Sequence, residues 1–79
     1  MIIRSQDRKS IINYSCIDKI YIRETDIWIR IIARDNIERI AAYSTEEKAI
    51  KVLDMIEDAC RNMAFTDGVV FQMPQDSEV

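Results

Sequence analysis

Aromatic and basic side chains alternate in the first half of the chain in a pattern that suits nucleotide binding. Four positions carry it: Tyr21, Arg23, Trp28 and Arg30. An aromatic ring offers a flat surface on which a base stacks, and a guanidinium forms paired hydrogen bonds with phosphate oxygens. Arg4 and Arg8 are further candidates for phosphate contacts, so the pattern predicts a ligand site made of stacking rings and cationic side chains.

Two other interpretations of these side chains stay open. Long arginine stems and a tryptophan also cover the solvent side of a thin sheet. The same surface would equally suit contact with a second copy of the chain. Ile32 and Ile40 are expected to lie on this surface too, which favours self-association because an exposed apolar patch usually marks a contact.

Residue types that commonly perform catalysis are scarce. The chain has no histidine, so Cys-His and Ser-His-Asp arrangements are excluded. Its one glycine, Gly68, cannot form a glycine-rich phosphate loop. Asp54 and Asp58 have the spacing of a solvated helix face. We therefore predict a protein that is not an enzyme and holds neither a metal nor a cofactor.

Length and cysteine content favour a small domain that self-associates. The 79 residues are enough for a single domain, residues 1–79, which would bury only about 60% of its unfolded surface. Cys16 and Cys60 form no CxxC pair, so we interpret them as small apolar residues in a reducing cytoplasm. Oligomerisation, most simply a homodimer, remains as the means of adding stability.

Alternating apolar and polar residues predict the strands that would position the ligand site. We expect strands at about residues 1–4, 11–14, 17–24, 27–34 and 37–43. In the fourth strand, one face carries Ile27, Ile29, Ile31 and Ala33, and the other carries Trp28, Arg30, Ile32 and Arg34. Asp35-Asn36 predicts a hairpin turn, with Asn36 tolerating positive φ.

A helix is expected over about residues 45–63. Ser44 and Glu47 have capping-box spacing, and apolar residues recur at helical intervals. Thr66-Asp67-Gly68 predicts a turn, residues 69–73 a last strand, and residues 75–79 a polar tail that adds nothing to the core. The predicted fold is α+β: an antiparallel β-meander of four to five strands with one long amphipathic helix packed on one face. The apolar stripe of that helix comprises Ala49, Val52, Leu53, Ile56, Cys60 and Met63.

The net charge of −3 is divided unevenly along the chain. Residues 1–43 are slightly basic, whereas residues 44–79 hold eight acidic against three basic side chains. An acidic protein is a poor binder of duplex DNA, which needs a basic surface. No run is long enough to span a membrane, and no signal peptide is recognisable. We therefore expect a cytoplasmic protein without duplex DNA or membrane as a partner.

Three stretches together resemble a known group of proteins: residues 2–7 (IIRSQD), 43–56 (YSTEEKAIKVLDMI) and 70–76 (VFQMPQD). In the same order, they are similar to a family of small uncharacterised phage and prophage proteins of low-GC Gram-positive bacteria. The family has no assigned reaction, so the resemblance carries over no catalytic residue. It implies a phage context and the cytoplasm of a host cell.

Small non-enzymatic phage proteins often oppose host defence, and this context gives three hypotheses. The first is an oligomeric sponge that sequesters a nucleotide-derived immune signal through the ligand site. The second is an acidic inhibitor that binds a host defence protein, such as a CRISPR nuclease, through the predicted helix. The third is a phage accessory protein without a small-molecule ligand. The acidic side chains concerned are Glu46, Glu47, Asp54, Glu57 and Asp58.

Overall fold

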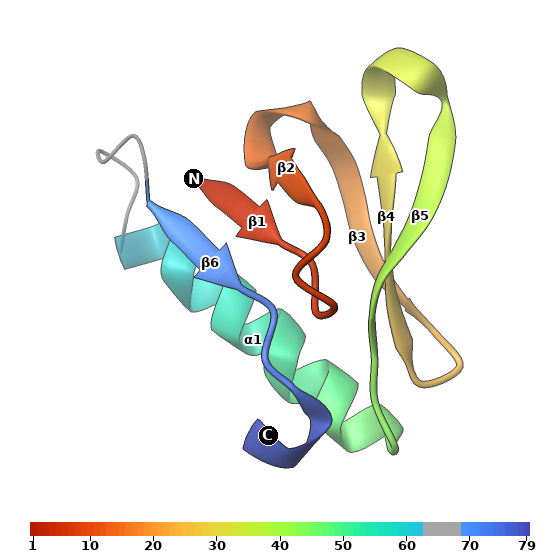
Figure 1. The fold of residues 1–79 in the computed structure, drawn as a ribbon, viewed down its shortest axis with the longest axis vertical. Coiled ribbons are helices and arrows are strands. Elements are labelled where there is room, and N and C mark those ends of the chain that lie inside the picture. The colour runs from red at the N-terminus through yellow and green to blue at the C-terminus, as the bar shows by residue number, and fades with distance from the viewer. Residues whose placement is uncertain (63–68) are drawn as a thin grey trace.

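The described part of the chain folds into six short strands and one long helix (Figure 1). A computed structural model describes residues 1–62 and 69–79. The strands form two three-stranded sheets, with orders β2-β1-β6 and β3-β4-β5. The predicted α+β class is confirmed, as are an antiparallel meander and a long helix packed against a sheet. The predicted turn at 66–68 and the predicted helix end at residue 63 lie outside the described residues.

The β3-β4-β5 sheet is an antiparallel meander. It comprises β3 (Ile17–Arg23), β4 (Asp26–Ile31) and β5 (Asn36–Ala42). On its inner face, Ile20 lies opposite Ile29, and Ile22 opposite Ile27. Ile27 and Ile29 are fully buried. The alternation seen in the sequence therefore assigns the two faces of this sheet correctly from Ile20 to Arg30.

The meander has three strands because the first two strands belong elsewhere. β1 (Ile2–Arg4) pairs antiparallel with β2 (Ile11–Asn13) and parallel with β6 (Val70–Gln72). After β2, a 3₁₀ turn labelled η1 (Tyr14–Cys16) redirects the chain, and Asn13 Oδ1 accepts from the Ser15 N–H at 3.0 Å. This local side-chain bond ends β2 and separates the two sheets.

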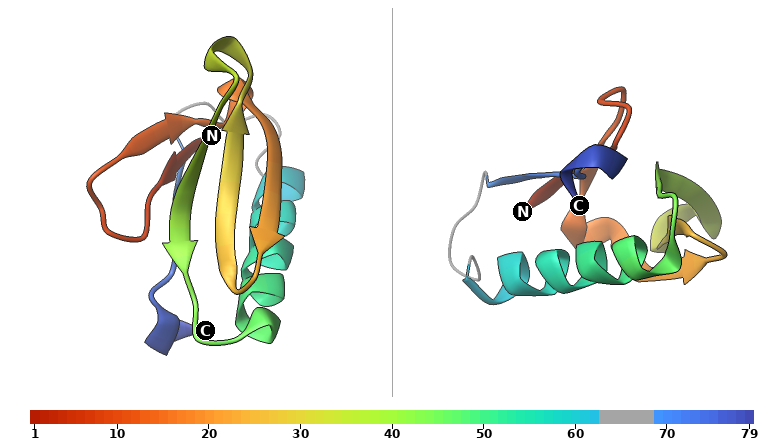
Figure 2. Two further views of the ribbon diagram at one scale, coloured as in Figure 1. Left: turned by 90° about the vertical axis from the view of Figure 1, so that its right-hand side faces the viewer. Right: turned by 90° about the horizontal axis from the view of Figure 1, so that it is seen from below.

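The helix α1 (Glu46–Asn62) runs along one side of the molecule and packs against β3 and β4 of the meander (Figure 2). Ala49, Val52 and Ile56 are buried in the shared core, and Leu53 and Cys60 are partly buried against it. The predicted apolar stripe is therefore correct at its described positions. Among the residues that the structure describes, no helix is long and apolar enough to cross a membrane.

The helix cap differs from the prediction by one residue. Thr45 Oγ1 accepts from the Lys48 N–H at 3.2 Å, so Thr45 is the cap of a helix that begins at Glu46. The Ser44 N–H instead donates to Asp76 Oδ1 at 2.8 Å. Because Ser44 is held by the C-terminal segment, the predicted pairing of Ser44 with Glu47 is not formed.

The segment after β6 is part of the fold and not a loose tail. Met73 is fully buried, and Val79 packs against the core. Residues Asp76–Glu78 form a 3₁₀ turn, η3, in which Gln75 and Glu78 make a reciprocal cap. The expectation that residues 75–79 contribute nothing to the core is therefore wrong.

Gln6 joins the two sheets and the C-terminal segment. Its amide nitrogen donates to the carbonyls of Ala42 at 3.0 Å and Pro74 at 3.1 Å. Its amide oxygen accepts from the Ala42 N–H at 2.8 Å. The Gln6 carbonyl accepts from Gln75 Nε2 at 2.7 Å, and Tyr43 Oη donates to Pro74 O at 2.8 Å. The three stretches of the phage-family resemblance thus meet in one hydrogen-bonded network.

Candidate functional site

The four predicted ligand-site residues lie on one face of the meander, opposite the core. Tyr21 pairs with Trp28 across β3 and β4, and Lys19 pairs with Arg30. Directly opposed residues of neighbouring strands point to the same face. We call this surface the outer face. Its side chains are those of Lys19, Tyr21, Arg23, Asp26, Trp28, Arg30, Ile37 and Arg39.

The outer face is arranged in three rows. The row next to the β3–β4 turn pairs Arg23 with Asp26. The middle row holds the two aromatic rings, with Arg39 beyond Trp28 on β5. The third row pairs Lys19 with Arg30. A flat aromatic strip therefore has basic side chains on both sides.

Each ring on this face already has a cation over it. The Arg23 guanidinium carbon lies 5.6 Å from the centroid of the Trp28 ring, and Lys19 Nζ lies 5.2 Å from that of Tyr21. Both are within the range of a cation–π interaction. A base would therefore stack on Trp28 beside or in place of the Arg23 guanidinium.

Arg30 is bound to the protein's own carboxylates. It makes a 2.8 Å ion pair with Asp35 and a 3.8 Å ion pair with Asp18. The Arg30 side chain is 49% exposed, and such solvent-exposed pairs each stabilise a protein by less than about 1 kcal/mol. An incoming phosphate can thus compete with these carboxylates for Arg30.

Sequence reasoning overlooked Arg39 and did not select Lys19 as site residues. Arg39 lies opposite Trp28 and forms a 3.4 Å ion pair with Asp26. Its place depends on an irregularity in pairing between Ile27 and Trp28, which alternation alone does not indicate. Lys19 could have been found from its position two residues before Tyr21, because side chains two apart share a face.

Other expected members of the outer face lie elsewhere. Ile40 is buried in the core, because the irregular pairing of β4 with β5 turns it inward. Ile32 and Arg34 belong to the 3₁₀ turn η2 (Ile32–Arg34), because β4 ends at Ile31. Asp35, and not Asn36, then has the positive φ, at 47°. The predictions for Ile32, Arg34, Asn36 and Ile40 are therefore wrong in these respects.

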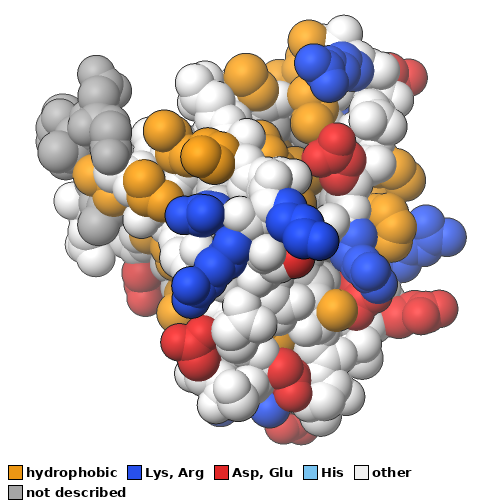
Figure 3. Space-filling view, viewed as in Figure 1, with side chains coloured by type: hydrophobic (Ala, Val, Ile, Leu, Met, Phe, Trp, Pro, Cys, Tyr) orange, Lys and Arg blue, Asp and Glu red, His pale blue; other side chains and the backbone are white. Residues whose placement is uncertain are grey.

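Arg4 and Arg8 are not brought into the outer face. Arg4 is on β1, and its guanidinium donates to the Arg8 carbonyl at 3.1 Å and 3.3 Å. Arg8 lies in the β1–β2 loop with a φ of 65°. Figure 3 shows basic side chains gathered across the middle of the side that carries this loop. These two arginines therefore belong to β1 and the loop after it, and not to the outer face.

Two hollows next to β3 and β4 differ in whether they suit a ligand. One, of about 300 Å³, is lined by Arg23, Glu24, Asp26 and Trp28 at the turn end of the outer face. Its two carboxylates disfavour phosphate there but leave the Trp28 side open to a neutral base. Phosphates would instead lie over the row of Lys19 and Arg30.

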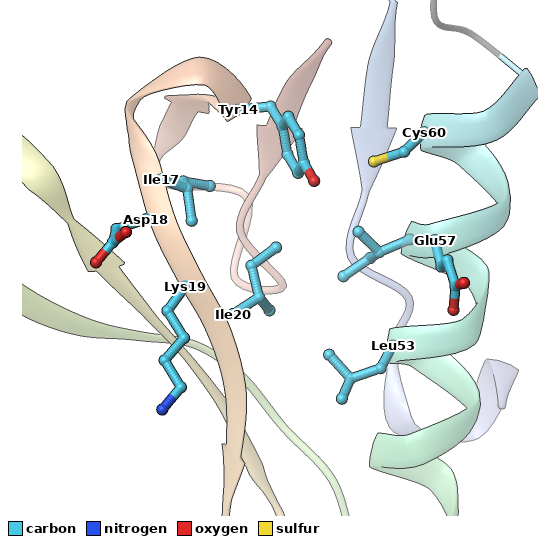
Figure 4. Close-up of a pocket in the computed structure, with 9 residues that line it drawn as sticks. Tyr14, Ile17, Asp18, Lys19, Ile20, Leu53, Glu57 and Cys60 are labelled. Atoms are coloured by element: carbon cyan, nitrogen blue, oxygen red, sulfur yellow. The ribbon is translucent and has the colours of Figure 1, made fainter.

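The other hollow, of about 260 Å³, lies between β3 and α1 (Figure 4). Ile20 and Leu53 point toward each other across it, and the Tyr14 hydroxyl points toward Cys60. The adjacent Cys60 thiol and partial burial raise the pKa of Tyr14. The floor consists of core side chains, so this hollow marks the seam between helix and sheet.

The described residues contain no cluster of three or more His, Cys, Asp or Glu side chains placed to hold a metal ion. Comparisons with protein-family models, with curated proteins and with solved structures find no match for this chain. The geometry of the outer face therefore carries the functional argument by itself.

Proposed function

We propose that the protein is a non-catalytic binding protein whose outer face holds a nucleotide-derived anion. In the phage context that the sequence resemblance implies, it would act in the host cytoplasm as a homo-oligomeric sponge for a nucleotide immune signal. The observation that carries the proposal is the pairing of Tyr21 with Trp28 beside the pairing of Lys19 with Arg30. Stacking and phosphate-binding groups thereby lie on adjacent rows of one sheet.

The rows suggest how a ligand would be oriented. The base would stack on Trp28, where the hollow and the Arg23 guanidinium lie. The phosphates would lie toward Lys19 and Arg30, with Arg39 on the flank of the ring. Successive residues on one face of a strand are about 7 Å apart, which is the scale of a nucleoside with its phosphate.

The single tryptophan gives a direct test. Trp28 is the only tryptophan in the chain, so its fluorescence reports on the proposed site alone. We expect a cyclic dinucleotide or ADP-ribose to quench it saturably. We also expect that ligand to raise the melting temperature, because a ligand at 100 times its Kd adds about 2.7 kcal/mol to the stability of the folded state.

Matched variants locate the ligand. Arg30→Ala should weaken binding by about 10-fold or more, since charge-assisted hydrogen bonds contribute about 1.5–3 kcal/mol. Arg61→Ala is the control, because Arg61 is an equally cationic side chain paired with Glu57 on the helix. A nucleotide panel that leaves both fluorescence and melting temperature unchanged would contradict the proposal. Equal binding by Arg30→Ala and wild type would show that the site is elsewhere.

A second candidate function rests on the acidic side of α1. Its acidic residues are all exposed, which suits contact with a basic surface of a defence protein. Such an inhibitor would ignore nucleotides. It would lose its effect at high salt and after Glu57→Lys with Asp58→Lys. The residues concerned are Glu46, Glu47, Asp54, Glu57 and Asp58. A protein insensitive to both tests would fit the accessory role.

A further inference from the structure

Three large aliphatic side chains are exposed at one end of the molecule. Ile11 on β2 is 67% exposed, Ile32 on η2 is 62% exposed, and Ile37 on β5 is 45% exposed. We call this end, with the turn between β4 and β5, the apolar end. Figure 3 shows hydrophobic side chains gathered there around a basic group. Such a patch on a small protein usually marks a contact surface.

A hollow of about 420 Å³ opens within the apolar end, between β2 and η2. Ile11 and Ile12 line one wall, and Ile31 and Ala33 line the other. Ile32 lies beside the hollow, because Ile31 and Ala33, which precede and follow it in the sequence, form the second wall. The surface therefore carries a projecting side chain next to a recess with apolar side chains on two walls, as a self-complementary contact requires.

The charges on the rim are also self-complementary. Arg34 and Glu38 both line the hollow. In the part of the chain that the structure describes, neither takes part in an ion pair. Under a two-fold axis, residue i of one copy meets residue j of the other and the reverse. One unpaired cation and one unpaired carboxylate on the same rim would thus form two reciprocal ion pairs.

We propose that a second copy of the chain docks on the apolar end about a two-fold axis. Ile32 of each copy enters the hollow of the other, and Arg34 of each copy pairs with Glu38 of the other. The inference rests on the homo-oligomer of the proposed function and gives that oligomer its surface. Ile37 belongs to both surfaces, and the rest of the outer face stays open in this arrangement. Arg30 lies near the contact because it pairs with Ile37.

Charge reversal tests the contact without disturbing the core. Arg34→Glu alone places two carboxylates opposite each other, and Glu38→Arg alone places two cations opposite each other. Each variant should weaken the dimer at least tenfold in analytical ultracentrifugation. An equimolar mixture of the two variants should regain the dimer, because both contacts between unlike copies pair opposite charges. No effect on stability or folding of the separate variants could produce that recovery.

An apolar pair of variants completes the test. Ile32→Asp should yield a monomer of 9.3 kDa, whereas Ile50→Asp, at a helix position that is 45% exposed, should leave the dimer intact. A dimer unchanged in the Arg34, Glu38 and Ile32 variants would overturn this surface and leave the proposed oligomer standing. A wild-type chain that remains monomeric at micromolar concentration would overturn both the contact surface and the proposed oligomer. Quenching of Trp28 fluorescence by a nucleotide tests ligand binding independently of the oligomeric state.

Discussion

Arg30 is the residue where folding and the proposed binding compete. Its guanidinium is held by Asp35 at 2.8 Å and by Asp18 at 3.8 Å. These contacts hold the side chain over the outer face. They also partly neutralise the positive charge of Arg30 that a phosphate would bind. The affinity of the site for an anion should therefore depend on the carboxylates beside Arg30.

We predict that Asp35→Asn increases the affinity for a nucleotide about two- to fivefold, consistent with the small energy of an exposed ion pair. Asparagine tolerates the positive φ of 47° at this position, so the change removes charge without altering the turn. Asp54→Asn changes the net charge equally on the far helix surface. Trp28 fluorescence titrations should separate the two variants; equal affinities would mean that Arg30 does not contact the ligand.

Asp76 makes the attachment of the C-terminal segment sensitive to acid. The hydrogen bond from the Ser44 N–H, assisted by Lys48, holds the pKa of this carboxyl below its ordinary value. A lowered pKa in the folded state contributes stability above the ordinary pKa. That contribution is lost as the pH falls through the lowered value.

The free energy of unfolding should therefore decrease between about pH 5 and pH 3 or below. Asp76→Asn keeps an oxygen that can accept from the Ser44 N–H but has no charge to lose. Its denaturant midpoint should decrease less steeply over this range than that of the wild type. The remaining slope should come partly from Asp7, whose pKa is lowered by the Ser5 hydroxyl. Parallel pH profiles for the two proteins would contradict this role of Asp76.

At the scale of elements, α1 shows how one stripe holds the core together. Ile56 is 4% exposed, while Ile50 on the same helix is 45% exposed. We predict that Ile56→Ala lowers the free energy of unfolding by about 2–5 kcal/mol, through lost burial and a new cavity. Ile50→Ala should change it by less than about 1 kcal/mol. Urea denaturation checks both, and comparable losses would indicate that Ile50 is buried in solution.

The extents of the elements could be predicted from the sequence because they follow from local patterns. Six strands and the helix lie within a few residues of their expected places, since alternation and helical spacing are properties of short segments. The outer-face positions of Tyr21, Arg23, Trp28 and Arg30 followed from the same alternation. Ile40 did not, because the irregular pairing that turns it inward is set by two strands jointly.

At the scale of the whole molecule, the arrangement of the sheets was not predictable from these patterns. The parallel pairing of β1 with β6 joins segments that are far apart in sequence. The side-chain amide of Gln6 forms hydrogen bonds with both the N–H and the carbonyl of Ala42, as the backbone of a neighbouring strand would. Neither feature produces a periodic pattern in the amino-acid sequence. The ion pairs of Arg30 also escaped prediction, because Asp35 reaches it only through the fold of η2.

The pairing of β1 with β6 has a consequence during synthesis. The meander pairs strands that follow one another along the chain, so it can form while the ribosome is still at work. β1 is translated before the meander, yet β6, its partner on one side, is translated only after α1. Until then, one edge of β1 is unpaired and open to chaperones and proteases. The interval between the emergence of Arg4 and that of Gln72 from the ribosome is therefore when we expect the nascent chain to be most vulnerable.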